Sequence, residues 1–115
     1  MAEEHAERRL AAILAADVVG YSRLMGEDDA GTLARLKQLR HDVFDPNTEK
    51  FGGRLFKTTG DGLLIEFPSA VDAVTHAVAV QRALEVANAD VSDNQQLTFR
   101  IGISLGDVIV DGDDL

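Results

Sequence analysis

The stretch Arg54-Leu-Phe-Lys-Thr-Thr-Gly-Asp-Gly-Leu-Leu-Ile-Glu-Phe67 decides the fold of this chain. It contains two apolar runs separated by Gly60-Asp61, and a glycine in the first position of a two-residue loop favours the type II′ turn of a β-hairpin. We therefore expect an antiparallel pair of strands. The register that this turn sets joins Thr59 with Gly62, Thr58 with Leu63, Lys57 with Leu64, and Phe56 with Ile65.

Side chains alternate between the two faces of a strand, so the hairpin has one face suited to pack on helices and one mixed face. The first face carries Phe56, Thr58, Leu63, Ile65 and Phe67. The second face carries Leu55, Lys57, Thr59, Leu64 and Glu66. Lys57 would thus lie on the mixed face with Asp61 at the turn above it. A solvated hairpin can bring such a pair together by chance, so the rest of the chain must show whether they form a site.

The composition describes one globular domain over residues 1–115, with 45% hydrophobic residues. No apolar run approaches the ~18 residues that span a membrane, and no signal-peptide pattern or cysteine is present, so we expect a cytoplasmic protein without disulfides. A net charge of -9 argues against nucleic-acid and membrane partners, although metal ions could still hold a small anionic ligand. The histidines His5, His41 and His76 show no ligand spacing and are expected on surfaces or helix faces.

The apolar run at residues 10–18 is interpreted as a buried strand, preceded at residues 1–9 by a charged lead-in or short helix. Asp17 is the one charged residue in this run, and a buried carboxylate is costly unless it is paired or binds a metal ion. Asp17 is therefore the first functional candidate, with a role in capping the next turn as the alternative. Gly20, Tyr21 and Ser22 follow, and a glycine with neighbouring N–H groups after a strand is a weak signal for an anion-binding loop.

Apolar spacing predicts two helices. The first runs for about five turns through Leu33, Leu36, Leu39, Val43 and Phe44. Asp45-Pro46 is expected to end it and to start a further segment, with Asp45 as the N-cap. The second helix begins at Ser69, which forms a capping-box pattern with Asp72, and residues 87–96 read as a polar turn region. Residues 97–106 alternate as a strand, residues 108–110 are expected to begin another, and residues 111–115 to form a turn.

The order strand, helix, strand, strand, helix, strand predicts an α+β protein with a ferredoxin-like βαββαβ core. Right-handed crossovers place both helices on one face of an antiparallel sheet and leave the other face open. That open face would be apolar enough to need a covering partner, since it carries Ile13, Ala15, Asp17, Leu55, Lys57, Leu64, Gly102 and Ser104. Asp17 and Asp61 would converge at one edge of the sheet, where they repel unless a divalent cation such as Mg²⁺ or Mn²⁺ joins them.

Three motifs in this order resemble the catalytic domain of class III nucleotidyl cyclases, the adenylate and guanylate cyclases. Asp17-Val-Val-Gly-Tyr-Ser22 resembles the first metal motif of that family. Lys57-Thr-Thr-Gly-Asp61 resembles its second strand-turn signature, and Arg100-Ile-Gly-Ile-Ser-Leu-Gly106 resembles the strand that follows. The resemblance runs from Leu10 to the last residue, and each motif falls on the element predicted for it.

The resemblance implies a metal and phosphate site. Asp17 and Asp61 would hold two Mg²⁺ or Mn²⁺ ions, and the backbone carbonyl of Val18 would bind one of them. The amides of Gly20-Tyr21-Ser22 would bind the triphosphate of ATP.

The resemblance also implies base recognition. Lys57 stands where adenylate-forming members have lysine and guanylate-forming members have glutamate, and a lysine donor suits the N1 acceptor of adenine. Asp114 resembles the second base-reading residue, an aspartate that could accept from the adenine amino group. Asp113 takes this role if the alignment shifts by one residue.

The activity implied is that of an adenylate cyclase, in which the ribose 3′-hydroxyl of ATP attacks the α-phosphorus to give cyclic AMP and pyrophosphate. Homodimeric members share each site between protomers, which would cover the open face. The family's transition-state asparagine and arginine would follow Leu115, so residues 1–115 are expected to be part of a catalytic domain and inactive alone. The alternatives are a guanylate cyclase, a diguanylate cyclase, whose Gly-Gly-Asp/Glu-Glu-Phe hairpin is absent, and a non-catalytic ferredoxin-like module that binds a ligand or partner.

Overall fold

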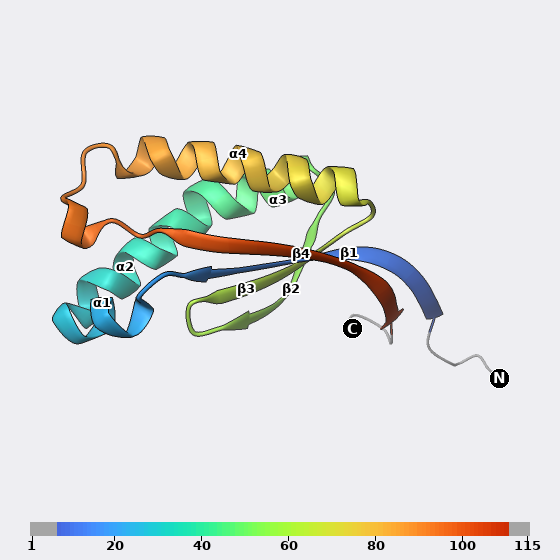
Figure 1. The fold of residues 1–115 in the computed structure, drawn as a ribbon, viewed down its shortest axis with the longest axis horizontal. Coiled ribbons are helices and arrows are strands. Elements are labelled where there is room, and N and C mark those ends of the chain that lie inside the picture. The colour runs from blue at the N-terminus through green and yellow to red at the C-terminus, as the bar shows by residue number, and fades with distance from the viewer. Residues whose placement is uncertain (1–6, 111–115) are drawn as a thin grey trace.

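The computed structural model describes residues 7–110 and, among them, the side chains of residues 10–93 and 95–106 (Figure 1). The elements in chain order are β1 (Glu7–Val18), α1 (Tyr21–Glu27), α2 (Asp29–Leu39), a π-helical turn η1 (Arg40–Phe44), α3 (Asp45–Lys50), β2 (Arg54–Thr59), β3 (Gly62–Phe67), α4 (Ala70–Asn88), a short 3-10 turn η2 (Asp93–Gln95) and β4 (Phe99–Val110). The turn predicted at residues 111–115 lies outside the described residues.

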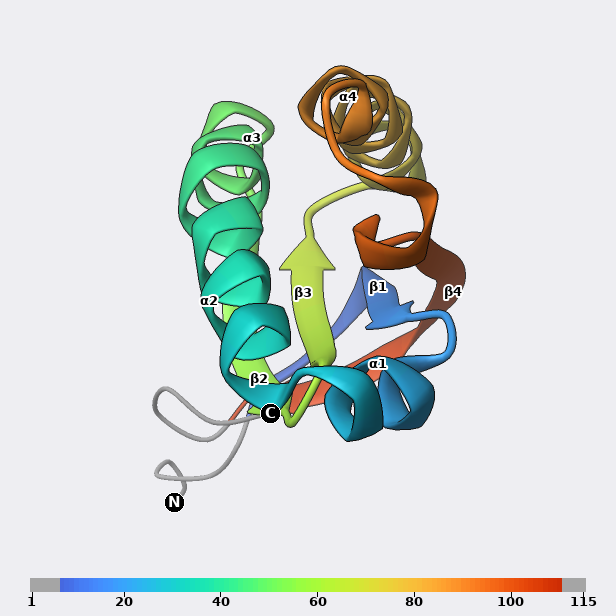
Figure 2. The same ribbon diagram turned by 90° about the vertical axis from the view of Figure 1, so that its left-hand side faces the viewer.

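The four strands form one antiparallel sheet in the order β2-β3-β1-β4. Helices α2, α3 and α4 lie on one side of this sheet, and α1 sits at the end where β1 finishes (Figure 2). Over the described residues the other side of the sheet carries no helix. The predicted α+β, ferredoxin-like fold is confirmed. Within this described part, no helix is both long and apolar enough to cross a membrane.

Strands β1 and β4 are longer than the sequence predicts. β1 begins at Glu7, where a charged lead-in or short helix is predicted, because residues 7–10 pair with residues 107–110 of β4. The separate strand predicted at residues 108–110 is for the same reason the continuation of β4. The predictions are therefore wrong at residues 7–9 and 108–110, where pairing of β1 with β4 satisfies backbone groups that local patterns cannot assign. Residues 1–6 of the predicted lead-in lie outside the described residues. Helix α4 also runs to Asn88, into the predicted turn region.

The first long helix is present, but Asp45-Pro46 does not break it. The chain passes from α2 through η1 into α3 in helical dihedrals, and Phe44 rather than Asp45 holds the N-cap position of α3. In η1 the N–H of Asp45 donates to the carbonyl of Arg40, the spacing of a π turn. This wider turn accommodates Pro46, which has no N–H to donate and would crowd the carbonyl of a regular α-helix. The predicted N-cap at Asp45 is therefore wrong.

The central hairpin has the predicted turn, with Gly60 at a φ of +48°, as the first turn position requires. Near the turn, three pairs agree with the prediction: Thr59–Gly62, Thr58–Leu63 and Lys57–Leu64. An irregularity at Phe56 then shifts the register, so that Leu55 instead of Phe56 pairs with Ile65. Leu55 consequently packs against the core, whereas the ring of Phe56 lies 6.0 Å from the guanidinium of Arg54. The predicted pair of Phe56 and the predicted open-face position of Leu55 are wrong.

The core lies between the sheet and the helices. Its fully buried apolar side chains come from β1, α2, η1, β3, α4 and the segment before β4, and include Leu14, Ile65, Phe67, Phe44 and Val80. His76 of α4 is also fully buried, with Nε2 3.1 Å from Oγ1 of Thr48 in α3. Burial lowers the pKa of His76 to about 4. His76 is thus a neutral residue that joins two helices inside the core.

The open face keeps the predicted parity along β1. Leu14 and Ala16 are buried under the helices, whereas Ala15 is exposed and Ile13 is half-buried on the other side. Leu64 of β3 is half-buried as well. This face is therefore partly apolar and accessible, as the sequence predicts.

Candidate functional site

The end of β1 and the hairpin turn meet at one edge of the sheet. Pairing of Ala16 with Leu63 makes Val18 and Asp61 neighbours, although they lie 43 residues apart. Oδ2 of Asp61 accepts a hydrogen bond from the N–H of Val18 at 3.0 Å. Asp17 precedes Val18, and its side chain is 45% exposed. The structure thus brings Asp61 to the strand end that carries Asp17.

A third charged residue, Arg100 of β4, joins the two acids. It stands directly opposite Asp17 in the sheet, and its Nε donates to Oδ1 of Asp17 at 2.9 Å. This hydrogen bond and the charge of Asp17 raise the pKa of Arg100, and the charge of Asp61 adds to the effect. Sequence reasoning assigned Arg100 no role. Strand alternation places it on the open face, but does not show which residue of β1 it meets.

The carboxylates of Asp17 and Asp61 fit a metal ion that takes its remaining ligands from the oxygens of a substrate. Among the described residues, no group of three His, Cys, Asp or Glu side chains could hold a metal ion by itself. Mg²⁺ is, however, commonly bound through one or two carboxylates together with water and substrate phosphates. The bond from Val18 fixes the orientation of the Asp61 carboxylate. Asp17 would have to exchange Arg100 for the cation.

The predicted anion-binding loop forms the start of α1. Gly20 adopts a left-handed φ of +68° and is the N-cap, with no side chain capping the helix. Its carbonyl accepts from the N–H of Leu24 at 3.0 Å, which closes the first turn. The N–H groups of Tyr21 and Ser22 belong to this turn, where backbone donors have no acceptor within the helix. Donors therefore lie just beyond the strand end that carries Asp17.

Lys57 lies on the same side of the sheet but away from the acids. It is exposed on β2 and pairs with Leu64 of β3, which in turn pairs with Ala15 of β1. Two strand spacings, about 10 Å, therefore separate its backbone from β1. Within one copy, the structure does not bring Lys57 to Asp17. Asp113 and Asp114 lie outside the described residues.

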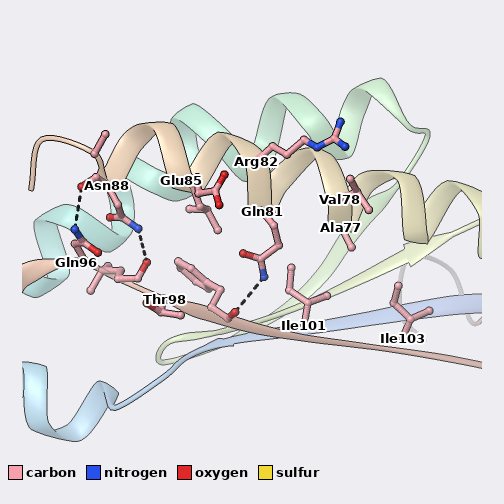
Figure 3. A pocket seen from close by; sticks show the side chains of 14 residues that line it. Ala77, Val78, Gln81, Arg82, Glu85, Asn88, Gln96, Thr98, Ile101 and Ile103 are labelled. Atoms are coloured by element: carbon pink, nitrogen blue, oxygen red, sulfur yellow. Dashed lines mark hydrogen bonds between the residues drawn. The ribbon is translucent and has the colours of Figure 1, made fainter. Parts of the chain in front are cut away.

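A large cleft of about 690 Å³ lies elsewhere, between α4 and β4 (Figure 3). Gln81 and Asn88 reach across it from α4, donating to the carbonyls of Phe99 and Leu97 at 3.1 Å each. Ile103 lies toward its apolar end. The cleft includes none of the predicted site residues, so its size does not mark it as the functional site.

Known proteins resemble this chain in sequence and in fold. No family model matches it. It is 49% identical over 115 residues, 100% of its length, to a protein of Rhizobium meliloti (strain 1021) named "Putative adenylate cyclase 3", of which it covers 20%. It matches the crystal structure of an adenylate/guanylate cyclase/hydrolase from Silicibacter pomeroyi with a TM-score of 0.86 and 42% identity, over 95% of this chain and 63% of that one. The guanylyl cyclase Cya2 matches with a TM-score of 0.79 and 26% identity, over 91% of this chain and 58% of that one.

The fold, a four-stranded antiparallel sheet with its long helices on one side (Figure 2), is thus shared with solved cyclase structures. In sequence and in fold, the chain is similar to class III adenylate/guanylate cyclases. It spans 20% of the curated relative's length, and 63% and 58% of the two solved chains. The names of these relatives include both adenylate and guanylate cyclases, so they leave the choice of nucleotide open.

Proposed function

We propose that the catalytic domain containing this chain converts ATP to 3′,5′-cyclic AMP and pyrophosphate, with two Mg²⁺ or Mn²⁺ ions. The observation that carries this proposal is the gathering of Asp17, Asp61 and Arg100 at the end of β1. In the reaction, a bond forms between the ribose 3′-oxygen and the α-phosphorus. The bond from that phosphorus to the bridging oxygen breaks, pyrophosphate leaves, and the hydroxyl proton passes to solvent.

The acids supply the metal ligands in this proposal. Asp17 and Asp61 bind the ions, together with the carbonyl of Val18. Bound ions would lower the pKa of the 3′-hydroxyl and neutralise phosphate charge. Because the N–H of Val18 already holds the Asp61 carboxylate at 3.0 Å, that ligand needs little reorganisation.

Arg100 has two successive partners. Its side chain is 72% exposed, so the guanidinium can leave Asp17 when a cation arrives there. The released guanidinium then lies beside the phosphates, which it can bind through two parallel N–H donors. The amides of Tyr21 and Ser22 add donors from the first turn of α1. Substrate and metal together would thus replace the ion pair between Arg100 and Asp17.

In this proposal, Lys57 and Asp114 recognise adenine. The ammonium of Lys57 donates to N1 of adenine, whereas guanine presents an N1–H donor that a lysine cannot satisfy. Because Lys57 is two strands away from Asp17, it serves the site of a second copy that packs on the open face. The apolar side chains of Ile13 and Leu64 supply contact area for such a homodimer.

Turnover by a catalytic domain of the length found in the solved cyclases tests this proposal. With Mn²⁺ and ATP, Asp17→Asn and Asp61→Asn should each lower the rate by ~10²-fold or more, as expected for loss of a preorganised charged group. Asp90→Asn makes the same charge change at an exposed position after α4 and should leave the rate unchanged.

Thermal melts establish that each variant is folded. A wild-type rate in either acid variant would refute the metal assignment. A preference for GTP over ATP would keep the metal site and make the product cyclic GMP, the alternative activity.

A further inference from the structure

A small pocket lies beneath the hairpin turn, on the helix side of the sheet. It encloses about 160 Å³ between α2, η1 and the turn. The buried side chains of Phe44, Leu63 and Phe99 border it from the core, and Leu33 and Leu36 of α2 line it from the helix. The pocket therefore offers an apolar space that opens toward the surface of α2.

Two cations line this pocket in a protein whose net charge is -9. Lys37 and Arg40 come from neighbouring turns of α2 and η1. Nε of Arg40 lies 3.8 Å from Oδ1 of Asp45, and such a solvent-exposed pair leaves the cation able to accept another anion. Thr58 adds a hydroxyl donor from β2, and Asp61 lines the pocket with its carboxylate directed to the N–H of Val18. The polar groups thus favour one anionic group at the mouth.

We propose that this pocket binds a small apolar molecule that carries one carboxylate, of about the size of benzoate. A protein cavity of about 150 Å³ lined by leucine and phenylalanine accepts benzene, so a ring fits the apolar part. The carboxylate then lies with Lys37 and Arg40, and a guanidinium is the donor that best matches its two oxygens.

A ligand in the pocket would also affect the hairpin turn that carries Asp61. Gly60 and Asp61 line the pocket and form the turn that carries the candidate metal carboxylate. A ligand packed against this turn restricts its movement and changes the affinity of Asp61 for a cation. This consequence rests on the proposed function, whereas the binding itself does not.

A ¹⁹F NMR titration of the chain with 4-fluorobenzoate, without metal, tests the binding. The resonance should shift saturably, and the neutral analogue 4-fluorobenzamide should bind about fivefold more weakly, as expected for partly exposed charge contacts. Lys37→Gln combined with Arg40→Gln should weaken 4-fluorobenzoate binding by a similar factor. Arg82→Gln removes an exposed cation from α4 and should leave it unchanged.

A variant with a larger side chain in the pocket tests whether the ligand binds there. Leu33 is 40% exposed, so Leu33→Trp can place a larger side chain at the pocket without rebuilding the core, and it should abolish binding. The proposal would be overturned if no saturable binding were seen. It would also be overturned if the wild type bound 4-fluorobenzoate and 4-fluorobenzamide equally well, and the double variant bound 4-fluorobenzoate as well as the wild type does. If Leu33→Trp does not fold, the charge variants still decide.

Mn²⁺ affinity, measured by electron paramagnetic resonance with and without saturating 4-fluorobenzoate, tests the coupling. A change of about twofold or more is expected, since coupled sites shift each other's affinity reciprocally. An unchanged affinity would overturn the coupling. A chain that binds no Mn²⁺ at all would instead count against the proposed function, while the titration without metal still decides the pocket.

Discussion

Acidification should destabilise this domain through one buried histidine. His76 is fully buried against the rings of Phe44, Phe51 and Phe67, and its Nε2 lies 3.1 Å from Oγ1 of Thr48. Its Nδ1 has no hydrogen-bond partner among the residues that the structure describes. Protonation makes both ring nitrogens donors and would leave a charged N–H unsatisfied in an apolar core. Burial therefore lowers the pKa of His76 to about 4.

The size of the effect follows from proton linkage. Unfolded, His76 titrates near its ordinary pKa of 6.5, whereas folded it titrates near 4. Above pH 6.5 both states hold the ring neutral, and its full contribution to stability is present. As the pH falls from 6.5 to about 4, the unfolded chain binds a proton that the folded chain does not. Stability then falls by up to ~1.4 kcal/mol per pH unit and by ~3 kcal/mol in all, against a typical total of ~5–15 kcal/mol.

Urea unfolding followed by circular dichroism, at several values between about pH 7.5 and about pH 4.5, measures this loss. His76→Gln removes the titrating ring, so this variant should start less stable but lose ~2 kcal/mol less on acidification than the wild type. His41→Gln is the comparison variant, because the side chain of His41 is 85% exposed and Asp42 raises its pKa, so removing this ring should not reduce the loss of stability on acidification. Carboxylates that titrate in the same range are common to all three proteins. Parallel pH courses for the wild type and His76→Gln would show that protonation of His76 does not cause the loss of stability.

The remaining predictions concern packing, capping and base choice. Gly53→Ala should cost ~1–3 kcal/mol of unfolding free energy, because its Cβ would stand 2.5 Å from the ring of Phe67; an unchanged urea midpoint would show that the ring yields freely. Ser69→Ala should lower the free energy of unfolding by about 1 kcal/mol, because it removes the acceptor of an N-cap hydrogen bond of 3.1 Å. Ser69→Asp keeps an acceptor at this position, so equal losses of stability for the two variants in thermal melts would argue against capping. In a full-length catalytic domain, Lys57→Glu with Asp114→Cys should shift the ATP-to-GTP turnover ratio ~10-fold or more toward GTP, since mismatched buried donors cost ~1–3 kcal/mol each. An unchanged ratio would show that neither residue takes part in base recognition.

The hairpin and the order of elements could be predicted because their signals are local. Gly60-Asp61 sets the turn, and strand alternation sets the side of the sheet on which Asp17 lies. The βαββαβ order then makes β1 and β3 neighbours, which brings Asp61 to Val18. The convergence of the two acids thus followed from topology and parity, without knowledge of any contact.

Other features depend on contacts that no local pattern encodes. Whether Leu55 or Phe56 enters the core depends on the shape of the space beneath the helices, and the register shift in β2 follows from it. Arg100 and Asp17 are 83 residues apart in the sequence and meet only through the register of β1 with β4. His76 has the spacing of an ordinary helix residue, and its burial comes from aromatic rings on separate elements.

In the proposed function, Asp17 and Asp61 hold metal ions for a site that two copies share. Two variants of the full-length catalytic domain, Asp17→Asn and Lys57→Glu, each remove one half of that site, and each alone should be nearly inactive with Mn²⁺ and ATP. In an equal mixture that exchanges subunits, half of the dimers contain one of each variant, and each such dimer has one intact site of two. About a quarter of the wild-type turnover should therefore return on mixing. A mixture no more active than its separate components, or an Asp17→Asn variant active by itself, would contradict the account.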